Sequence, residues 1–295
     1  MPVVALNAGG LRFGRLARDG YRKGVPSSIT HRGRRCGGSS VCVVQISARH
    51  CERRRPDRFR RRGHSCPAAR LAGSHCSLSP PRRAAHSARA LAILLRQHGE
   101  MRFPPRGKWR PFTAEQTIAI HEPGFVWHAL CDVMPLVTAE VFDSYVGVEG
   151  RLEARLFGSV RVAKAAGPQT ARAELMRYLA ELAWVPDAIR YNPALRWRAL
   201  DHRTFEVSAD AAGGEARVCL IFNENGDIAG MKADDRPRTE GSKTVSGKWF
   251  GAFSGHKTLA GYRIPLCGEV GWELDTGRFT YWRGEIKDLH VRFAG

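Results

Sequence analysis

The sequence predicts a mainly β (α+β) fold: a curved antiparallel sheet or half-barrel with one main helix packed across it, preceded by a disordered basic N-terminal third. Three observations support this class. After about residue 90, apolar and polar residues alternate with a period of two in segment after segment, as in strands that turn one face to a core and the other to water. Glycine, proline and asparagine separate these segments, and one stretch has the period of a helix.

The basic charge of the chain is concentrated in its first third. The protein has 295 residues and a formal net charge of +19. Residues 1–100 contain 21 basic and four acidic residues, whereas residues 101–295 contain 26 basic and 24 acidic residues and all seven tryptophans. We therefore expect a disordered Arg-rich segment, residues 1–90, followed by a single antiparallel β half-barrel domain, residues 91–295.

Three explanations fit the composition of residues 1–90, and we favour the first. Twenty arginines against one lysine among the first 100 residues are typical of a GC-rich gene translated in the wrong frame or from a wrong start. The alternatives are an inert tail and a basic arm, residues 30–90, that binds nucleic acid non-specifically through its phosphates. Cysteines and histidines also occur here, but without the paired spacing of zinc ligands, so we expect no metal site.

Alternation predicts about ten strands in the second region. Their apolar faces, in chain order, include Phe112, Ala114, Ile118 and Ile120; Phe125, Trp127, Ala129, Cys131 and Val133; Leu152, Ala154 and Leu156; Phe205, Val207 and Ala209; Ala216, Val218, Leu220 and Phe222; and Val270, Trp272 and Leu274. The Asn225-Gly226 step predicts a hairpin with a type I′ turn, which needs positive φ at both central residues.

The segment after Gly167 has helical periodicity instead. Pro168 suits the first turn of a helix, and an apolar stripe follows at helical spacing, made of Leu175, Met176, Leu179, Leu182 and Ala183. Pro186 ends this helix soon after Trp184, and a second, short helix is expected near Asp187–Tyr191. A single main helix among many strands predicts that it packs across the curved sheet.

Four tryptophans are the strongest candidates for an apolar binding surface. They alternate with polar neighbours, so we expect them on the inner face of the sheet: Trp127, Trp197, Trp249 and Trp272. A curved sheet with so aromatic an inner face must fill its concavity with its own side chains, with its helix or with an apolar ligand. These alternatives separate a structural protein from a carrier.

Charged and phenolic side chains are expected at the mouth of this concavity. Asp143 lies beside Tyr145 in a strand, and Glu174 precedes Tyr178 by one helical turn, with Arg177 between them. If the helix covers the concave face, these side chains converge there. An ordinary salt bridge and a helix-to-sheet hydrogen bond that hold the helix in register are the alternative to a reactive site, and we favour that alternative.

Several stretches also carry a family resemblance: Gln97-His-Gly-Glu-Met-Arg102, Trp109-Arg-Pro-Phe-Thr-Ala-Glu-Gln116, Pro123-Gly-Phe-Val-Trp127, Asp143-Ser-Tyr145, Glu174-Leu-Met-Arg-Tyr-Leu-Ala-Glu181, Trp249 with Phe253, Gly261-Tyr-Arg-Ile-Pro265 and Tyr281-Trp282. With them, residues 95–295 resemble an uncharacterised bacterial family known only as a domain of unknown function. More distantly, the order of elements is similar to that of the lipoprotein-carrier (LolA-like) half-barrels. In those proteins a curved sheet and its covering helices enclose an apolar cavity for acyl chains, so this likeness implies ligand binding.

We therefore expect non-catalytic binding of a lipid or another apolar molecule, with the four tryptophans lining the site and Asp143, Tyr145, Glu174, Arg177 and Tyr178 at its mouth. A small hydrolase or isomerase that uses Asp143 or Glu174 is the alternative, and non-specific nucleic-acid binding through residues 30–90 is the second. No catalytic residue, cofactor or metal ligand is predicted, and the oligomeric state stays open. No apolar run is long enough to span a bilayer and no signal peptide is recognisable, so the sequence as written is that of a cytoplasmic protein, but the compartment stays open.

Overall fold

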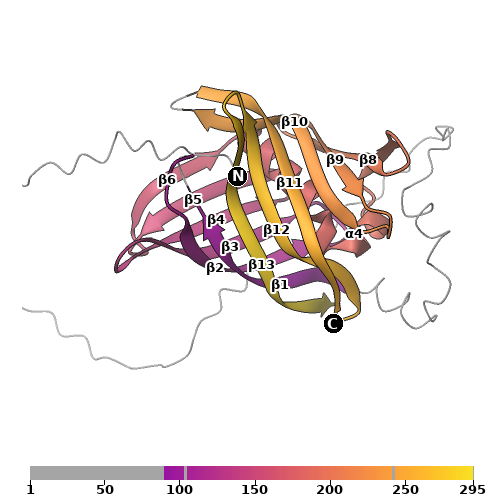
Figure 1. The fold of residues 1–295 in the computed structure, drawn as a ribbon, viewed down its shortest axis with the longest axis horizontal. Helices are drawn as coiled ribbons and strands as arrows, with labels where there is room; N and C mark the ends of the chain where they lie inside the picture. Colours follow the sequence, from indigo (N-terminus) through magenta and orange to yellow (C-terminus); the bar gives the residue numbers. More distant parts are fainter. Residues whose placement is uncertain (1–89, 103–104, 241–242, 295) are drawn as a thin grey trace, which may run out of the picture. The chain divides into compact units, whose positions relative to one another are not determined.

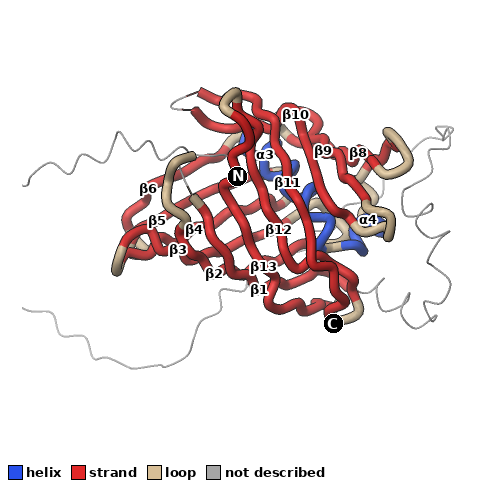
Figure 2. The backbone as a smooth tube through the Cα atoms, viewed as in Figure 1, coloured by secondary structure: helices blue, strands red, loops and turns tan. Residues whose placement is uncertain are grey.

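The alternating segments of the sequence form the strands of one large sheet. A computed structural model describes residues 90–102, 105–240 and 243–294, and in this part of the chain thirteen strands pair into a single antiparallel sheet curled around a helix (Figures 1 and 2). The predicted half-barrel is therefore confirmed, with more strands than the expected ten or so. The predictions for residues 1–89 lie outside the described residues.

The sheet consists of two meanders joined along its middle. Its strands are β1 (Ala90–Met101), β2 (Arg110–Ala119), β3 (Phe125–Met134), β4 (Val137–Val146), β5 (Glu149–Leu156), β6 (Val160–Ala166), β7 (Arg196–Ala199), β8 (Thr204–Ala211), β9 (Gly214–Phe222), β10 (Ile228–Glu240), β11 (Lys243–Leu259), β12 (Tyr262–Leu274) and β13 (Gly277–Phe293). The order across the sheet is β6-β5-β4-β3-β2-β1-β13-β12-β11-β10-β9-β8-β7. The first and last strands thus pair with each other at the centre, and β6 and β7 form the two edges.

The helical segment connects these two edges across the concave face (Figure 2). It consists of α3 (Pro168–Ala180), the 3₁₀ turn η1 (Glu181–Trp184) and α4 (Pro186–Tyr191), so both predicted helices are present. Helix α3 contacts β4, β5 and β6 on one side and β8, β9 and β10 on the other. It therefore bridges the two ends of the curled sheet, and its side chains from Ala173 to Ala180 are all buried.

Two glycines let the start of α3 lie directly on the sheet backbone. A Cβ on Gly150 in β5 would be 2.6 Å from the Cα of Ala171, and one on Gly213 would be 2.3 Å from the carbonyl oxygen of Pro168. Both distances are shorter than the contacts of real side chains, and both involve backbone atoms that cannot rotate away. The helix can therefore approach the sheet this closely only where side chains are missing.

One turn differs from its prediction. The Asn225-Gly226 step does connect two paired strands, β9 and β10, but only Gly226 of the two residues has a positive φ, of 77°. The loop is longer than a two-residue turn, because the side chain of Asn223 accepts hydrogen bonds from the backbone N–H groups of Asn225 and Asp227, each at 3.0 Å. The predicted type I′ turn is therefore wrong, since the asparagine side chain organises the loop instead.

The close contact between α3 and Gly150 of β5 leads to a prediction about stability. Gly150→Ala should lower the free energy of unfolding by about 1–3 kcal/mol, because the added methyl group forces α3 away from β5. Gly124→Ala is the matched control, since a Cβ there meets its nearest neighbours at an ordinary 3.5 Å. The control should leave stability unchanged or raise it by up to about 1 kcal/mol. Equal effects of both substitutions in chemical denaturation would contradict the proposed close packing.

Candidate functional site

A row of buried polar side chains crosses the inner face of the sheet. Strand register places Gln116, Trp127 and Asp143 opposite one another on β2, β3 and β4. The indole N–H of Trp127 donates to Oε1 of Gln97 at 2.9 Å, and Nε2 of Gln97 donates to Oε1 of Gln116 at 2.7 Å. Gln116 in turn donates to Oε2 of Glu181 at 2.5 Å. Three central strands are thereby hydrogen-bonded to the turn that follows α3.

Arg177 is the centre of this polar cluster. Its Nε donates to Glu181 at 2.7 Å and its Nη1 donates to Asp143 at 2.6 Å, while its guanidinium lies 4.8 Å from the ring centre of Phe125 and 5.0 Å from that of Trp127. Burial disfavours its charge, but the carboxylates of Glu181, Asp143 and neighbouring Glu174 outweigh this and raise the pKa of Arg177 above its ordinary value. The guanidinium of Arg177, on the helix, therefore links the helix to the 3₁₀ turn and to the sheet.

Glu174 and Arg236 form a second, looser pair beside the first. Both side chains are completely buried, and their nearest charged atoms are 4.0 Å apart. Neither carboxylate oxygen of Glu174 and none of the three guanidinium nitrogens of Arg236 is hydrogen-bonded to another described residue. The guanidinium of Arg236 stacks on Trp249, 3.9 Å from its ring centre. Burial, together with the charge of Asp143, raises the pKa of Glu174 from 4.5 to about 8.

An apolar cavity opens next to this cluster, between η1 and strands β10 to β13. Its lining is mostly aromatic and aliphatic, with one ion pair: Arg177, Ala180, Glu181, Trp184, Met231, Trp249, Phe253, Val270, Tyr281 and Trp282. Its empty volume is about 450 Å³ with the open mouth included, whereas the centre of a water molecule can occupy only about 40 Å³ of it. The cavity is therefore tight, and we refer to it below as the slot.

Two of the three tryptophans that line the slot have their indole N–H bonded to the protein. Trp184 donates its indole N–H to the carbonyl oxygen of Pro265 at 3.0 Å, and Trp249 donates to the hydroxyl of Tyr281 at 3.1 Å. The ring of Trp184 packs edge-on against Phe253 and Trp282, with ring centres 5.5 and 6.3 Å apart. These bonds fix the rings in place and leave carbon surface toward the slot.

The structure brings some of the predicted site residues to the slot and places others behind it. Of the nine, Trp249 and Arg177 line it. Asp143 and Glu174 are fully buried beside Arg177, and Trp127 and Trp272 are buried without lining it. Trp197 is half-buried on the edge strand β7. The remaining two are the tyrosines, Tyr145 and Tyr178, which serve the packing of α3.

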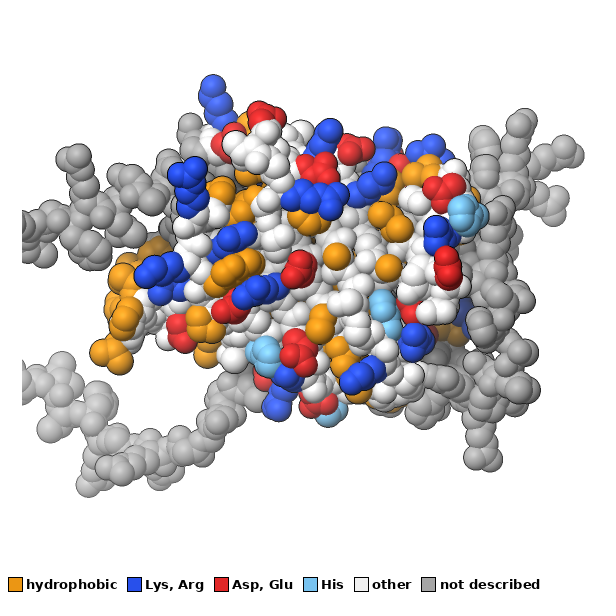
Figure 3. Space-filling view, in the orientation of Figure 1, with side chains coloured by type: hydrophobic (Ala, Val, Ile, Leu, Met, Phe, Trp, Pro, Cys, Tyr) orange, Lys and Arg blue, Asp and Glu red, His pale blue; other side chains and the backbone are white. Residues whose placement is uncertain are grey.

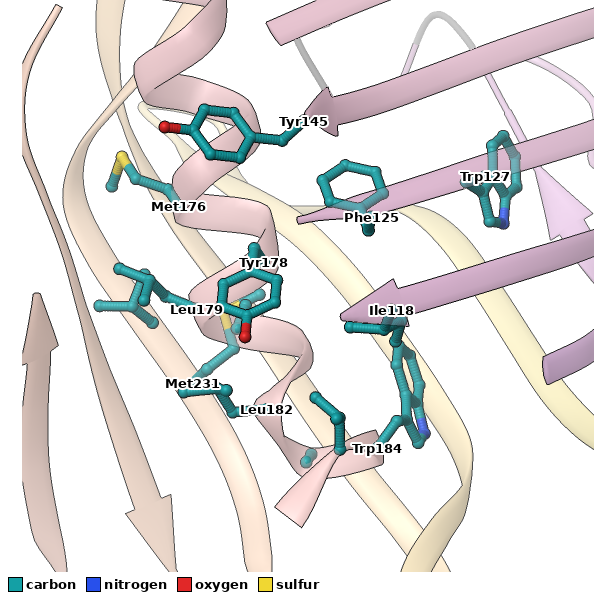
Figure 4. Packing of buried hydrophobic residues seen from close by; sticks show 14 of the residues in the cluster. Ile118, Phe125, Trp127, Tyr145, Met176, Tyr178, Leu179, Leu182, Trp184 and Met231 are labelled. Carbon is teal, nitrogen blue, oxygen red and sulfur yellow. The ribbon is translucent and has the colours of Figure 1, made fainter. Parts of the chain in front are cut away.

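Tyr145 and Tyr178 join the helix to its surroundings. Figure 4 shows Tyr145 and Phe125 on strands that face α3, which carries Met176 and Tyr178. The hydroxyl of Tyr178 donates to the carbonyl oxygen of Ala119 at 3.1 Å and accepts a hydrogen bond from the amide of Asn192 at 2.9 Å. Burial raises the pKa of both tyrosines. This geometry corresponds to the helix-to-sheet hydrogen bond weighed as the structural alternative.

Most of the slot lining was not predicted as a site. The missed residues are Ala180, Glu181, Trp184, Met231, Phe253, Val270, Tyr281 and Trp282. Simple alternation cannot place the adjacent residues Tyr281 and Trp282 on one face of a strand, yet both are buried. The reason is a β-bulge: the pairing of β12 and β13 shifts by one residue there and leaves Tyr281 as the extra residue. The available signal was the family resemblance, which includes Phe253, Tyr281 and Trp282.

The described residues offer neither a metal site nor a membrane-spanning helix. No group of three or more His, Cys, Asp or Glu side chains there is arranged to hold a metal ion. Among the same residues, no helix combines the length and apolar character needed to cross a membrane.

The buried carboxyl group of Glu174 leads to a prediction about how the free energy of unfolding depends on pH. Above pH 4.5 the unfolded chain releases the Glu174 proton, but the folded protein keeps it until about pH 8, so the free energy of unfolding falls as pH rises through this window. Glu174→Gln removes this dependence. Thermal melts should show the variant gaining stability relative to the parent protein, by about 1 kcal/mol or more, between pH 4.5 and about 8.

The control for this experiment is Glu224→Gln, because the side chain of Glu224 is 91% exposed. That variant should follow the parent protein in parallel over the whole pH range. A Glu174→Gln curve that also runs parallel to the parent would show that Glu174 is ionised in the folded protein, against this interpretation.

Comparisons with known proteins identify relatives of the described domain. The model of a family of unknown function, DUF6920, matches residues 84–291, which confirms the resemblance to an uncharacterised family. Among curated proteins, nothing matches.

Solved structures with a similar fold match at low identity. A putative outer membrane lipoprotein-sorting protein domain from Vibrio parahaemolyticus is 11% identical, with a TM-score of 0.41 over 71% of this chain and 90% of that chain. A LolA superfamily protein from Nitrosomonas europaea is 9% identical, with a TM-score of 0.38 over 72% and 92%. A DUF1329 family protein from Desulfovibrio piger is 10% identical, with a TM-score of 0.39 over 71% and 89%.

Proposed function

The chain belongs to the family of unknown function DUF6920, and we propose that it binds an elongated apolar molecule, such as a lipid acyl chain, in the slot between η1 and β10 to β13. The observation that carries this proposal is the slot itself. Its lining is mostly aromatic and aliphatic, and Arg177 and Glu181 are its only charged lining residues among those described. A space of this kind is suited to a molecule that displaces water from carbon surface.

The dimensions of the slot favour a thin ligand. Because the centre of a water molecule can reach only about 40 Å³, a bulky fused-ring molecule would require the walls to move. A single hydrocarbon chain is one carbon wide and can contact the rings of Trp184, Trp249 and Trp282 along its length. Met231, the one methionine of the lining, has a flexible side chain that can adapt to such a ligand.

The ion pair at the slot gives the ligand an orientation. Arg177 and Glu181 hold each other and are tied to the sheet through Asp143 and Gln116. An apolar chain gains nothing by contact with these charges, whereas the polar end of an amphiphile does. We therefore expect the hydrocarbon part of the ligand to lie against the tryptophans and its polar end to lie toward Arg177.

The alternative function, a hydrolase or isomerase that uses Asp143 or Glu174, has less support. Neither carboxylate lines the slot, and both side chains are fully buried. The hydrogen bond from Arg177 also commits one oxygen of Asp143 to holding the helix. Nucleic-acid binding by residues 30–90 concerns a segment outside the described residues.

Native mass spectrometry of the full chain, followed by organic extraction, tests the proposal. A retained mass that dissociates into a lipid or another long apolar molecule is the expected result, and its identity names the ligand class. If the protein is instead folded and empty, and also takes up no fatty acid offered in solution, the proposed function is wrong.

Val270→Phe provides a sharper test, because Val270 lines the slot and a phenyl ring there would fill it. The variant should lose at least about nine-tenths of the retained ligand, roughly 1.4 kcal/mol of affinity, while its melting temperature stays the same or rises through cavity filling. Val291→Phe is the matched control, since Val291 is a half-buried valine of β13 outside the lining. Ligand loss in the control, or full retention in a folded Val270→Phe protein, would contradict the assigned site.

A further inference from the structure

Two neighbouring turns expose large apolar side chains at one end of the sheet. The turn from β3 to β4 ends in Leu136, whose side chain is completely exposed, and the turn from β5 to β6 begins with Phe157, which is 68% exposed. Met134 and Val160 beside them are also exposed. The register brings the turns together, because β4 pairs with β3 on one side and with β5 on the other. In Figure 3 hydrophobic side chains gather at this end.

The backbone at both turns makes these residue types more unusual. Leu136 has a φ of 63° and Phe157 a φ of 52°, in the left-handed region where glycine and asparagine are favoured. Within the three-residue loop between β5 and β6, Phe157 and Gly158 are the two central residues of a β-turn closed by a hydrogen bond from the N–H of Ser159 to the carbonyl oxygen of Leu156 at 3.2 Å, and both have positive φ. Such a turn prefers Asn-Gly, so phenylalanine there adds strain and no packing.

Basic residues lie at the same end of the sheet as the two turns. The β1–β2 connection lies at the same end, because Met101 pairs with Arg110. From Met101 to Ala114 the chain contains four basic residues and no acidic one, and Arg106 and Lys108 are exposed. In the β5–β6 hairpin, Glu153 is already bound by both Arg155 and Arg161. Basic residues therefore outnumber acidic ones at this end of the sheet, where Asp132, beside the turn at Leu136, is an exposed acidic residue.

We propose that this end of the sheet, formed by the turns at Leu136 and Phe157, docks onto an anionic phospholipid bilayer. Exposed leucine and phenylalanine side chains would enter the boundary between headgroups and acyl chains, and the neighbouring arginines and lysines would contact the lipid phosphates. Two exposed turns of a few residues each suit a soft surface better than a protein partner, whose stable interface needs an area of about 1,000 Å² or more. The proposal does not depend on a ligand in the slot.

The test compares vesicle binding by the full-length parent protein with vesicle binding by a full-length variant that lacks these two side chains. The double variant Leu136→Asn with Phe157→Asn places at both positions a residue that tolerates the left-handed backbone. Its melting temperature should be equal to or above that of the parent protein. Its partitioning onto phosphatidylcholine–phosphatidylglycerol vesicles, measured by sedimentation at moderate salt, should fall about tenfold or more. The salt weakens attraction through charge alone.

Val148→Asn is the matched control. Val148 lies in the β4–β5 turn, at the other end of the same strands, and is 68% exposed, as Phe157 is. It should bind vesicles like the parent protein. A second variant, Arg106→Glu with Lys108→Glu, should lose binding to the mixed vesicles but bind pure phosphatidylcholine vesicles unchanged.

Three results would overturn the proposal. The asparagine double variant could bind vesicles as tightly as the parent protein, or the Val148→Asn control could lose as much. Alternatively, the double variant could keep its vesicle binding and be a monomer in analytical ultracentrifugation under conditions in which the parent protein proves to be a dimer. That last result would assign the turns to a contact between copies of the chain.

Discussion

The positive charge of Arg177 is the constraint on which the packing of helix and sheet depends. A guanidinium with a side chain only 10% exposed needs opposite charge and hydrogen bonds at close range, and it obtains them from Asp143 on β4 and Glu181 on η1. Removing one partner of such a buried pair typically costs about 3–5 kcal/mol, because the other charge stays buried. The bond to Asp143 fixes the rotation of α3, and Glu181 extends the network through Gln116 to Gln97 and Trp127.

This polar network also sets the environment of the neighbouring slot. Because Arg177 and Glu181 satisfy each other, the walls beyond them can be aromatic without leaving an ionised group facing carbon. Glu174 and Arg236 follow a different rule, since they are buried 4.0 Å apart without direct hydrogen bonds. A protonated Glu174 is the less costly state there, because neutral carboxyl groups lose less on desolvation than ionised ones. The ion pairs of Arg177 with Asp143 and Glu181 thus hold the helix, whereas the neighbouring Glu174 and Arg236 make the stability of the fold depend on pH.

The sequence predicted most of the fold because period-two and period-3.6 patterns report which face of an element is buried. It predicted less of the site. Asp143, Glu174 and Arg177 do converge, but whether they hold the helix or gate a ligand depends on side-chain rotamers, which no pattern contains. Trp197 alternates with polar neighbours just as Trp249 does, yet it lies on the short edge strand β7. Trp184 on a 3₁₀ turn and Tyr281 at a bulge escape periodicity altogether, because both features interrupt the repeat.

Two places in the domain depart from the usual distribution of residue types: apolar residues are exposed at one, and ionisable residues are buried at the other. Along most of the sheet, burial, turn chemistry and charge agree with one another, as expected for a sequence that specifies one fold. At Leu136 and Phe157, large apolar residues are exposed on left-handed backbone; at Glu174 and Arg236, ionisable residues are buried without direct hydrogen bonds. Neither arrangement improves stability, since asparagine would suit the turns and apolar residues would suit the interior. At the turns, residues that folding does not require are explained by the proposed contact with a membrane; at Glu174 and Arg236, neither of which lines the slot, the buried pair is a cost to stability that becomes larger as the pH rises.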